Sequence, residues 1–328
     1  MKYIFGPVPS RRFGFSLGID IIPRGATTAT EGSPRGRSPR GTKYCTLDCI
    51  YCQIGKTTNL TLQRKKYVAV KPVLDELKKV LESPPKADPP LAEKTKIDCL
   101  TFSGSGEPTL NSNIGKMISE IKKISKIPVV VITNGTLFYM PDVQNDLLKA
   151  DIVAPSLDAI LSFRKINRPH KSLEIKKIVG GLVKFRKIYR GKIWLEVMLV
   201  KNVNDSEKEI ATIKKAIKKI KPDKIHLNTV VRPPAETYAK PIEQEKLLKI
   251  KKYFGKNCEI ISDTSKRGKN LIGTNVPQRI LEMLKRRPMQ ISDLNKTLGV
   301  DNKIIRKELW LLERKKMVCC RKNWWIKK

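Results

Sequence analysis

The feature that most constrains the fold is an alternation of short apolar runs with amphipathic runs over residues 14–262. The apolar runs are continuous, as expected for strands buried on both faces of a sheet. They cover residues 16–22, 96–104, 127–135, 151–157, 192–200, 222–231 and 258–263. The amphipathic runs repeat apolar residues at helical spacing and cover residues 71–83, 112–125, 141–150, 173–189, 205–220 and 242–254. This alternation predicts an α/β fold with a parallel sheet, either barrel-like or doubly wound, whose functional residues gather at the carboxyl ends of the strands.

Three cysteines follow the first predicted strand. Cys45, Cys49 and Cys52 lie within eight positions in the segment KYCTLDCIYCQIG. A structural zinc ion takes four ligands, and neither His170 nor His226 belongs to a pair spaced as metal ligands are. A [4Fe–4S] cluster bound by three cysteines instead keeps one iron open to a substrate or cofactor. We therefore predict an open iron–sulfur cluster on this loop.

The C-x3-C-x2-C spacing, with the aromatic Tyr51 directly before the third cysteine, resembles the radical S-adenosylmethionine (radical SAM) superfamily. The resemblance covers about residues 1–262 and implies a partial (β/α)6 barrel of the TIM type. It also implies two cofactors, a [4Fe–4S] cluster and S-adenosylmethionine (SAM), whose methionine moiety chelates the open iron. Reductive cleavage of SAM to a 5′-deoxyadenosyl radical, and an electron donor such as ferredoxin or flavodoxin, follow from the same resemblance.

Later strand ends carry further motifs of the superfamily in the expected order. Residues 104–107 resemble its glycine-rich element, in which glycines admit a ligand to the backbone and a carboxylate complements the methionine ammonium. The polar residues after the fourth strand match positions that often bind ribose. The predicted SAM contacts are Tyr51, Gly104, Ser105, Gly106, Glu107, Thr133, Asn134, Ser156 and Asp158. Glu196 is a charge inside the fifth apolar run, and fits a site residue and an outward strand position equally well.

Two longer segments, YIFGPVPSRRFGFSLGIDIIP and LNTVVRPPAE, resemble one prokaryotic group of radical SAM proteins. That group is described as iron–sulfur oxidoreductases related to wyosine-type tRNA-modifying enzymes. The chain departs from the group at residues 24–42, which consist almost wholly of Gly, Pro, Ser, Thr, Ala and Arg. Such a run buries too little to offset its ordering entropy, so we expect a flexible excursion. A tolerated insertion, a basic arm ordered by nucleic acid and an irregularity of the sequence itself all remain open.

The C-terminal part of the chain changes character. We predict a radical SAM core over residues 1–264, a linker over 265–275 and a small domain over 276–328. In this last segment three helices precede a short strand pair, the order of a winged-helix domain. Its basic residues outnumber the acidic ones by 15 to 5. In the third helix Lys303, Arg306, Lys307 and Arg314 are available to phosphates, although winged helices also dock proteins.

The net charge favours a polyanionic partner. Lys and Arg number 67 against 31 Asp and Glu, a formal charge of +36. This excess favours tRNA or DNA, the alternative being a Lys-rich solvated surface. The longest apolar run is too short for a membrane span and the N-terminus lacks a signal-type apolar region, so we predict a cytoplasmic protein with no membrane partner. Reduced thiols follow, with Cys99 and Cys258 in the core and Cys319 and Cys320 on opposite faces of a strand.

Three hypotheses about function remain. The first is a radical SAM enzyme that acts on RNA delivered by the C-terminal domain. The second is a radical SAM enzyme that acts on a small molecule or a protein. The third is a non-catalytic DNA-binding regulator with a redox-sensing cluster, which would not need the motifs at 104–107, 133–134 and 156–158. The sequence identifies neither a substrate nor a catalytic residue.

Overall fold

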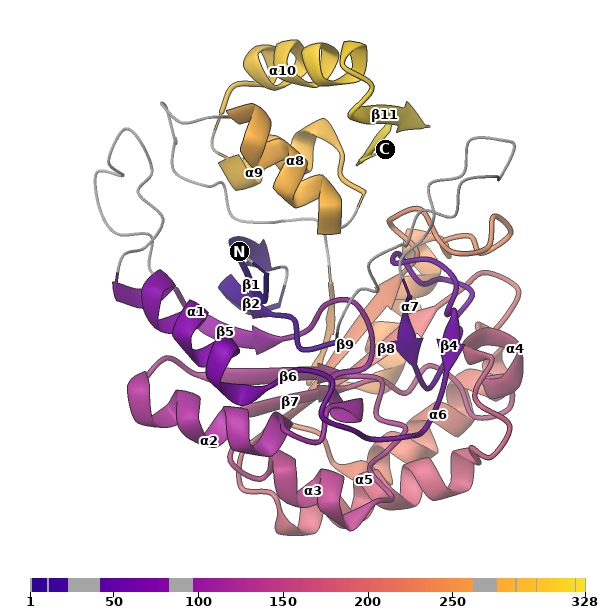
Figure 1. Ribbon diagram of the computed structural model, residues 1–328. Helices are drawn as coiled ribbons and strands as arrows, with labels where there is room; N and C mark the ends of the chain where they lie inside the picture. The colour runs from indigo at the N-terminus through magenta and orange to yellow at the C-terminus, as the bar shows by residue number, and fades with distance from the viewer. Residues whose placement is uncertain are drawn as a thin grey trace.

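The computed structural model describes residues 2–10, 12–22, 42–82, 97–261, 276–286, 288–298, 300–321 and 323–327 (Figure 1). The predicted insertion at 24–42, apart from Thr42, and the predicted linker at 265–275 lie outside these ranges. Within them, every helix falls short of the length and apolar character that crossing a membrane requires.

An eight-stranded sheet forms the body of the protein, in the order β1-β2-β5-β6-β7-β8-β9-β10. Its strands are β1 (Ile4–Ser10), β2 (Gly14–Ile19), β5 (Cys99–Phe102), β6 (Val129–Thr133), β7 (Ile152–Pro155), β8 (Lys192–Leu199), β9 (Lys224–Thr229) and β10 (Cys258–Ile260). β1 and β2 pair antiparallel, and every later pair in this sheet is parallel. The predicted parallel sheet is confirmed, and β1 is an additional edge strand that the apolar pattern did not predict.

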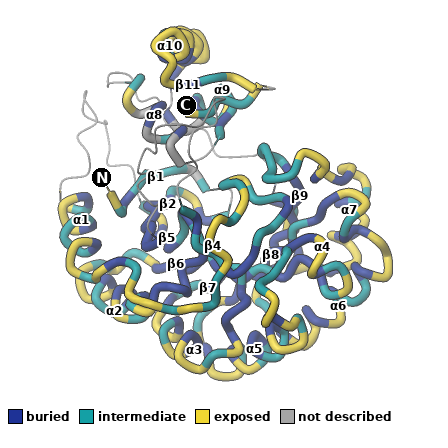
Figure 2. The backbone as a smooth tube through the Cα atoms, turned by 45° about the vertical axis from the view of Figure 1, so that its right-hand side comes forward, coloured by how far each residue is buried: buried dark blue, intermediate teal, exposed yellow. Residues whose placement is uncertain are grey.

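Helices cover the outer face of the sheet (Figure 1). They are α1 (Val70–Glu82), α2 (Ile114–Ile124), α3 (Pro141–Leu147), α4 (Phe163–Asn167), α5 (Ile175–Ile188), α6 (Glu207–Ile220) and α7 (Gln244–Phe254). Figure 2 shows the strands largely buried and the exposed residues gathered on the outer sides of the helices. The curved sheet inside a layer of helices is the α/β arrangement that the sequence predicts.

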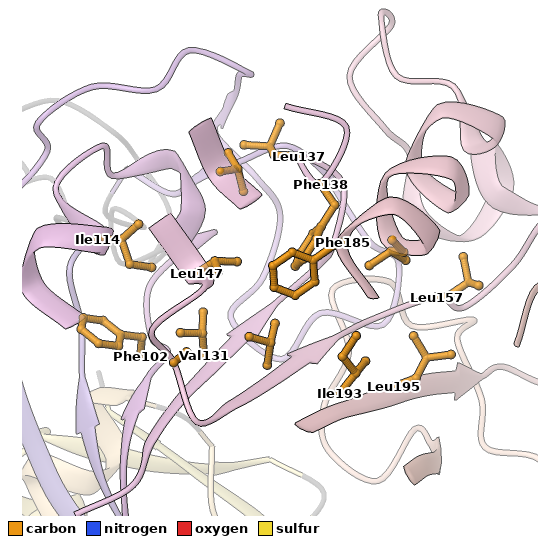
Figure 3. Close-up of a cluster of buried hydrophobic side chains, with 14 of the residues drawn as sticks. Phe102, Ile114, Val131, Leu137, Phe138, Leu147, Leu157, Phe185, Ile193 and Leu195 are labelled. Atoms are coloured by element: carbon orange, nitrogen blue, oxygen red, sulfur yellow. The ribbon is translucent and has the colours of Figure 1, made fainter. Parts of the chain in front are cut away.

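The main hydrophobic core lies between the sheet and these helices (Figure 3). Phe138 and Phe185 pack edge to face in it, with ring centroids 4.8 Å apart. Ile193 and Leu195 of β8 also point into this core. Because successive side chains of a strand point to opposite faces, Glu196 must face the inside of the barrel.

Two adjacent glycines of α5 have different surroundings. A Cβ atom on Gly181 would lie 2.5 Å from the backbone of Phe138 and Tyr139, so the helix packs directly on the segment after β6. A Cβ atom on Gly180 would meet no atom within 4 Å. Gly181 is therefore required for packing, and Gly180 is not.

We expect Gly181→Ala to lower the free energy of unfolding by about 1–3 kcal/mol, because the added methyl group forces the helix away. Gly180→Ala is the matched control and is expected to raise stability by roughly 0.4–1 kcal/mol through the unfolded chain. Chemical denaturation of both variants checks this. Equal effects of the two substitutions would contradict the packing.

The C-terminal unit has its own small core, formed by residues such as Ile280, Leu294, Ile305 and Leu309. Its elements are α8 (Val276–Arg286), α9 (Ile291–Leu298), α10 (Asn302–Arg314) and the antiparallel strands β11 (Val318–Arg321) and β12 (Trp324–Lys327). This is the predicted order of helices and strands. The winged-helix assignment and the domain boundaries stay predictions.

The C-terminal unit lies over β1 (Figures 1 and 2). α9 contacts β1, whereas α10 lies on the side of the unit that faces away from the sheet. The two faces of the unit therefore have different neighbours, the barrel on one side and solvent on the other.

Candidate metal and cofactor site

The cysteine loop runs between β3 (Tyr44–Cys45) and β4 (Asn59–Leu60), which pair in parallel. Its three cysteines are free thiols. Thr57 closes the loop, because its N–H donates to Asp48 Oδ1 at 2.6 Å and its hydroxyl donates to the carbonyl of Leu47 at 2.7 Å. A segment of irregular backbone is thereby held in one conformation.

Two distant segments also hold this loop. The guanidinium of Arg168 lies 2.6 Å from Glu236 Oε1 and 3.7 Å from Asp48 Oδ2. The N–H of Glu236 donates to the carbonyl of Ile50 at 2.9 Å. Glu236 ends the segment LNTVVRPPAE, so this segment supports the cysteine loop.

Each cysteine sulfur lies within hydrogen-bond distance of a side-chain nitrogen. The pairs are Cys45 with Asn134 Nδ2 at 3.5 Å, Cys49 with Asn167 Nδ2 at 3.3 Å and Cys52 with Lys43 Nζ at 3.1 Å. Burial raises the pKa of Cys45 to about 11 and the pKa of Cys49 well above its usual value. Since metals bind the thiolate, occupation of this site would release protons.

Lys43 has an unusual environment for a lysine. Its residue is only 5% exposed. Burial alone lowers the pKa of Lys43, but Cys52, Cys45 and Cys49 together raise it above the ordinary value. A buried ammonium is costly unless anionic groups surround it. The site is therefore suited to three thiolates.

The three thiols are compared with the ligand sets of a single metal ion and of a cluster. Among the described residues, no three His, Cys, Asp or Glu side chains converge as the ligands of one metal ion do. In a four-iron cluster each thiolate binds a different iron, so its ligands lie farther apart than those of a zinc ion. The three cysteines and their nitrogen donors are thus consistent with the predicted [4Fe–4S] cluster.

A cavity of about 500 Å³ opens at the carboxyl ends of the strands, beside the cysteine loop. All three cysteines line it. Seven of the nine predicted SAM contacts also line it, namely Tyr51, Gly104, Gly106, Glu107, Thr133, Asn134 and Ser156. The structure therefore brings the two parts of the predicted site together.

The glycines of the 104–107 element serve the packing of the site itself. Gly104 has φ +148°, and a Cβ atom there would lie 2.3 Å from the carboxyl carbon of Asp20. A Cβ atom on Gly106 would lie 2.0 Å from the carbonyl oxygen of Tyr44. The element can therefore approach β3, and the N–H of Glu107 donates to the same carbonyl at 3.1 Å.

Glu107 is buried and held by four donors. Its Oε1 accepts from the N–H and hydroxyl of Thr109 at 3.1 and 2.6 Å and from the hydroxyl of Thr133 at 2.6 Å. Its Oε2 accepts from the N–H of Asn134 at 2.7 Å. Burial raises the pKa of Glu107, and these hydrogen bonds oppose that shift. The carboxylate is thus fixed in orientation at the wall of the cavity.

Ser105 and Asp158 are not among the residues that line this cavity. The hydroxyl of Ser105 donates to Asp20 Oδ2 at 2.5 Å. Asp158 accepts from the hydroxyl of Tyr51 and from Asn167 Nδ2, the latter at 2.8 Å. Burial raises the pKa of Asp158 to about 6. The geometry gives both residues a supporting position, and their contact with SAM stays a prediction.

Glu196 lies inside the barrel, which decides between the two positions that the sequence left open. It forms an ion pair with Arg12 and accepts from Asn228 Nδ2 at 3.2 Å. Arg12 lines the cavity. Sequence analysis missed Arg12, Asn228, Lys43 and Asn167. Arg12 lies between β1 and β2. Its position at the site could be inferred only from the pairing of these two strands.

We expect Cys49→Ala to lose the cluster, because two thiolates on this loop leave two irons without a protein ligand. Iron and sulfide content after anaerobic reconstitution measures the loss. Cys320→Ser is the matched control, since Cys320 is exposed on β11. Iron retention by Cys49→Ala at the level of the control would contradict this site.

Family models match two parts of the chain. Residues 40–213 match the radical SAM superfamily, and residues 265–324 match the N-terminal domain of the methanogenesis regulatory protein FilR1. The first match spans more than half of the chain and contains all three cysteines.

Curated relatives extend over most of the chain. A UPF0026 protein from Methanocaldococcus jannaschii is 35% identical over 308 residues, which cover 92% of this chain and 88% of the relative. A protein named GTPase Obg from Brachyspira hyodysenteriae is 42% identical over 264 residues, 80% of this chain. That match covers 35% of the relative, so the chain spans about a third of its length.

Two enzymes are more distant relatives. GTP 3′,8-cyclase from Clostridium acetobutylicum is 30% identical over 171 residues, 51% of this chain and 48% of the enzyme. A probable dual-specificity RNA methyltransferase RlmN from Thermotoga petrophila is 29% identical over 220 residues, 63% of this chain and 58% of the enzyme.

Among solved structures, a radical SAM methyltransferase from Sphaerobacter thermophilus matches with a TM-score of 0.50 at 15% identity. The match covers 67% of this chain and 65% of that one. It confirms the partial barrel as the fold. The chain belongs to the radical SAM superfamily, together with the UPF0026 proteins, and enzymes of this superfamily use a [4Fe–4S] cluster and SAM.

Proposed function

We propose that the protein is a radical SAM enzyme that modifies RNA. The observation that carries the radical chemistry is one cavity whose wall contains the three thiols, Glu107 and Asn134. Cys45, Cys49 and Cys52 would hold the [4Fe–4S] cluster. The cluster would pass one electron, taken from a donor such as ferredoxin or flavodoxin, to bound SAM, whose cleavage would give methionine and a 5′-deoxyadenosyl radical.

The residues around the cavity would bind and orient SAM. Glu107 offers a carboxylate of fixed orientation to the methionine ammonium, a charge-assisted contact. Ser156, at the end of β7, offers a hydroxyl to the ribose. Asp158 and Ser105 would support SAM binding indirectly. Asp158 orients Tyr51, and Ser105 fixes the 104–107 element on Asp20.

The exposed face of α10 supports nucleic acid as the partner. Lys303, Lys307, Trp310 and Arg314 follow one another at helical spacing on the side opposite the buried residues of this helix. Trp310 is 53% exposed, and the Arg314 guanidinium lies 4.8 Å from its ring centroid. Exposed aromatic rings among basic side chains are typical of surfaces that stack on unpaired bases. The relative RlmN is named as a probable RNA methyltransferase, which adds support for RNA.

A small-molecule substrate is the second candidate, and the position of the C-terminal unit favours it. Met283, Met289 and Leu298 line the outer part of the cavity together with residues of β1. These three side chains, the apolar roof, leave space for a small ligand and oppose entry of a polynucleotide from that side. The GTP 3′,8-cyclase relative acts, by its name, on a nucleotide.

Anaerobic protein reconstituted with iron and sulfide is expected to form 5′-deoxyadenosine from SAM and dithionite. The Cys49→Ala variant should form none. To identify the substrate, the rate of 5′-deoxyadenosine formation is measured after addition of tRNA from cells that lack the gene, tRNA from wild-type cells or a low-molecular-mass cell extract. We expect only the tRNA from cells that lack the gene to raise this rate. Stimulation by the extract alone would favour the second candidate and contradict RNA.

We expect Lys307→Glu to weaken tRNA binding severalfold and to reduce the slope of log K against log salt by about 0.7, the value for one phosphate contact on a single strand. Trp310→Ala should weaken the free energy of tRNA binding by about 1–3 kcal/mol and leave the salt slope unchanged, because stacking is not ionic. Lys218→Glu on α6 makes the same charge change at another exposed position. If it weakens binding as much as Lys307→Glu, α10 is not the interface.

A further inference from the structure

One of the three sulfur contacts differs from the others in charge. Asn134 and Asn167 bring neutral amides to Cys45 and Cys49, whereas Lys43 brings an ammonium to Cys52. This lysine begins the segment KYCTLDCIYCQIG, two residues before the first cysteine, and lies outside the C-x3-C-x2-C motif itself.

The ammonium of Lys43 is held in a fixed position. Its Nζ donates to Cys52 Sγ at 3.1 Å and to the carbonyl of Gly55 at 2.8 Å, and its own backbone N–H donates to Thr58 Oγ1 at 2.7 Å. Among the described residues, no carboxylate forms a salt bridge with it. The Cys52 sulfur, which becomes anionic when it binds iron, lies 3.1 Å from this ammonium, and solvent screens the pair little because the lysine is buried.

A fixed positive charge beside a cluster ligand stabilises the more negative of two redox states. Reduction transfers one electron from a low-potential one-electron donor, which is oxidised, and adds one negative charge beside this ammonium. The effect acts through Cys52 and the local field, so Lys43 need not touch SAM or the substrate.

We propose that Lys43 is a positioning residue that raises the reduction potential of the cluster and so allows a low-potential donor to reduce it. The proposal rests on the proposed function in one respect, namely that the three cysteines hold a [4Fe–4S] cluster. It adds a determinant of potential that lies outside the cysteine motif.

The test is a dithionite titration of the reconstituted full chain without SAM, followed by electron paramagnetic resonance. For Lys43→Met we expect the ratio of reduced to oxidised cluster at a fixed potential to fall about tenfold, which is about 59 mV for a one-electron couple. Lys43→Arg keeps the charge and should stay close to wild type. Lys56→Met is the matched control, because Lys56 lies on the same loop but its side chain is 56% exposed.

A wild-type ratio for Lys43→Met would overturn the proposal, and so would an equal shift for Lys56→Met. The reduction potential is a property of the bound cluster, so the measurement is still possible if a variant binds less iron. If Lys43→Met binds no cluster, Lys43→Gln keeps a donor without the charge and should show the same tenfold fall. If neither binds a cluster while Lys43→Arg does, Lys43 retains the cluster and does not tune it, which also overturns the proposal.

The two proposals fail in different ways. Wild-type protein that shows a reducible cluster but forms no 5′-deoxyadenosine contradicts the proposed enzyme and leaves the role of Lys43 intact. Wild-type protein that binds no cluster contradicts both.

Discussion

The structure depends on one constraint, which is that three sulfur atoms on a loop of irregular backbone must keep fixed positions at the end of a barrel. Within the loop the N–H of Cys52 donates to the carbonyl of Cys49 and the N–H of Gly55 to that of Cys52, and further contacts come from other segments. Arg168 and Glu236 hold its outer side. Asn134 and Asn167 reach its sulfurs from segments that follow β6 and end α4. The barrel therefore holds the loop from several strand ends at once.

This arrangement explains why polar residues at different strand ends act as one site. Glu107 is oriented by donors from its own segment and from the end of β6, and Asp158 orients Tyr51 beside Cys49. A change at one strand end therefore affects the position of groups at another. Among the described residues, Lys43 is the one lysine or arginine whose residue is buried, and it lies beside the cysteines.

Much of the fold follows from local pattern, because continuous apolar strands and amphipathic helices differ in period. β1 escaped prediction because its sequence IFGPVPS contains a glycine and two prolines, which weaken strand signals and fit an edge strand with an irregular register. The three cysteines and the seven predicted SAM contacts that line the cavity were found from motifs. Arg12, Asn167 and Asn228 were not, because their partners lie 184, 118 and 32 residues away in the chain. Lys43 is close to the cysteines in sequence, but its side chain is directed toward Cys52 only once the loop folds back at Gly55.

The two faces of the C-terminal unit separate two questions about function. Its apolar roof belongs to the cavity, and its basic α10 faces solvent, so a nucleic acid on α10 and a ligand in the cavity need not be the same molecule. The chemistry in the cavity is the common element of both candidate functions. In both, the chemistry would rest on a cluster held by three cysteines, with one iron open to SAM.

The open iron is tested most directly by Mössbauer spectroscopy. The protein is reconstituted with isotopically enriched iron, and spectra are recorded before and after addition of SAM. The account predicts a four-iron cluster in which one iron alone changes its isomer shift when SAM binds. Four irons that do not respond to SAM, or a protein that takes up zinc and no cluster, would contradict it.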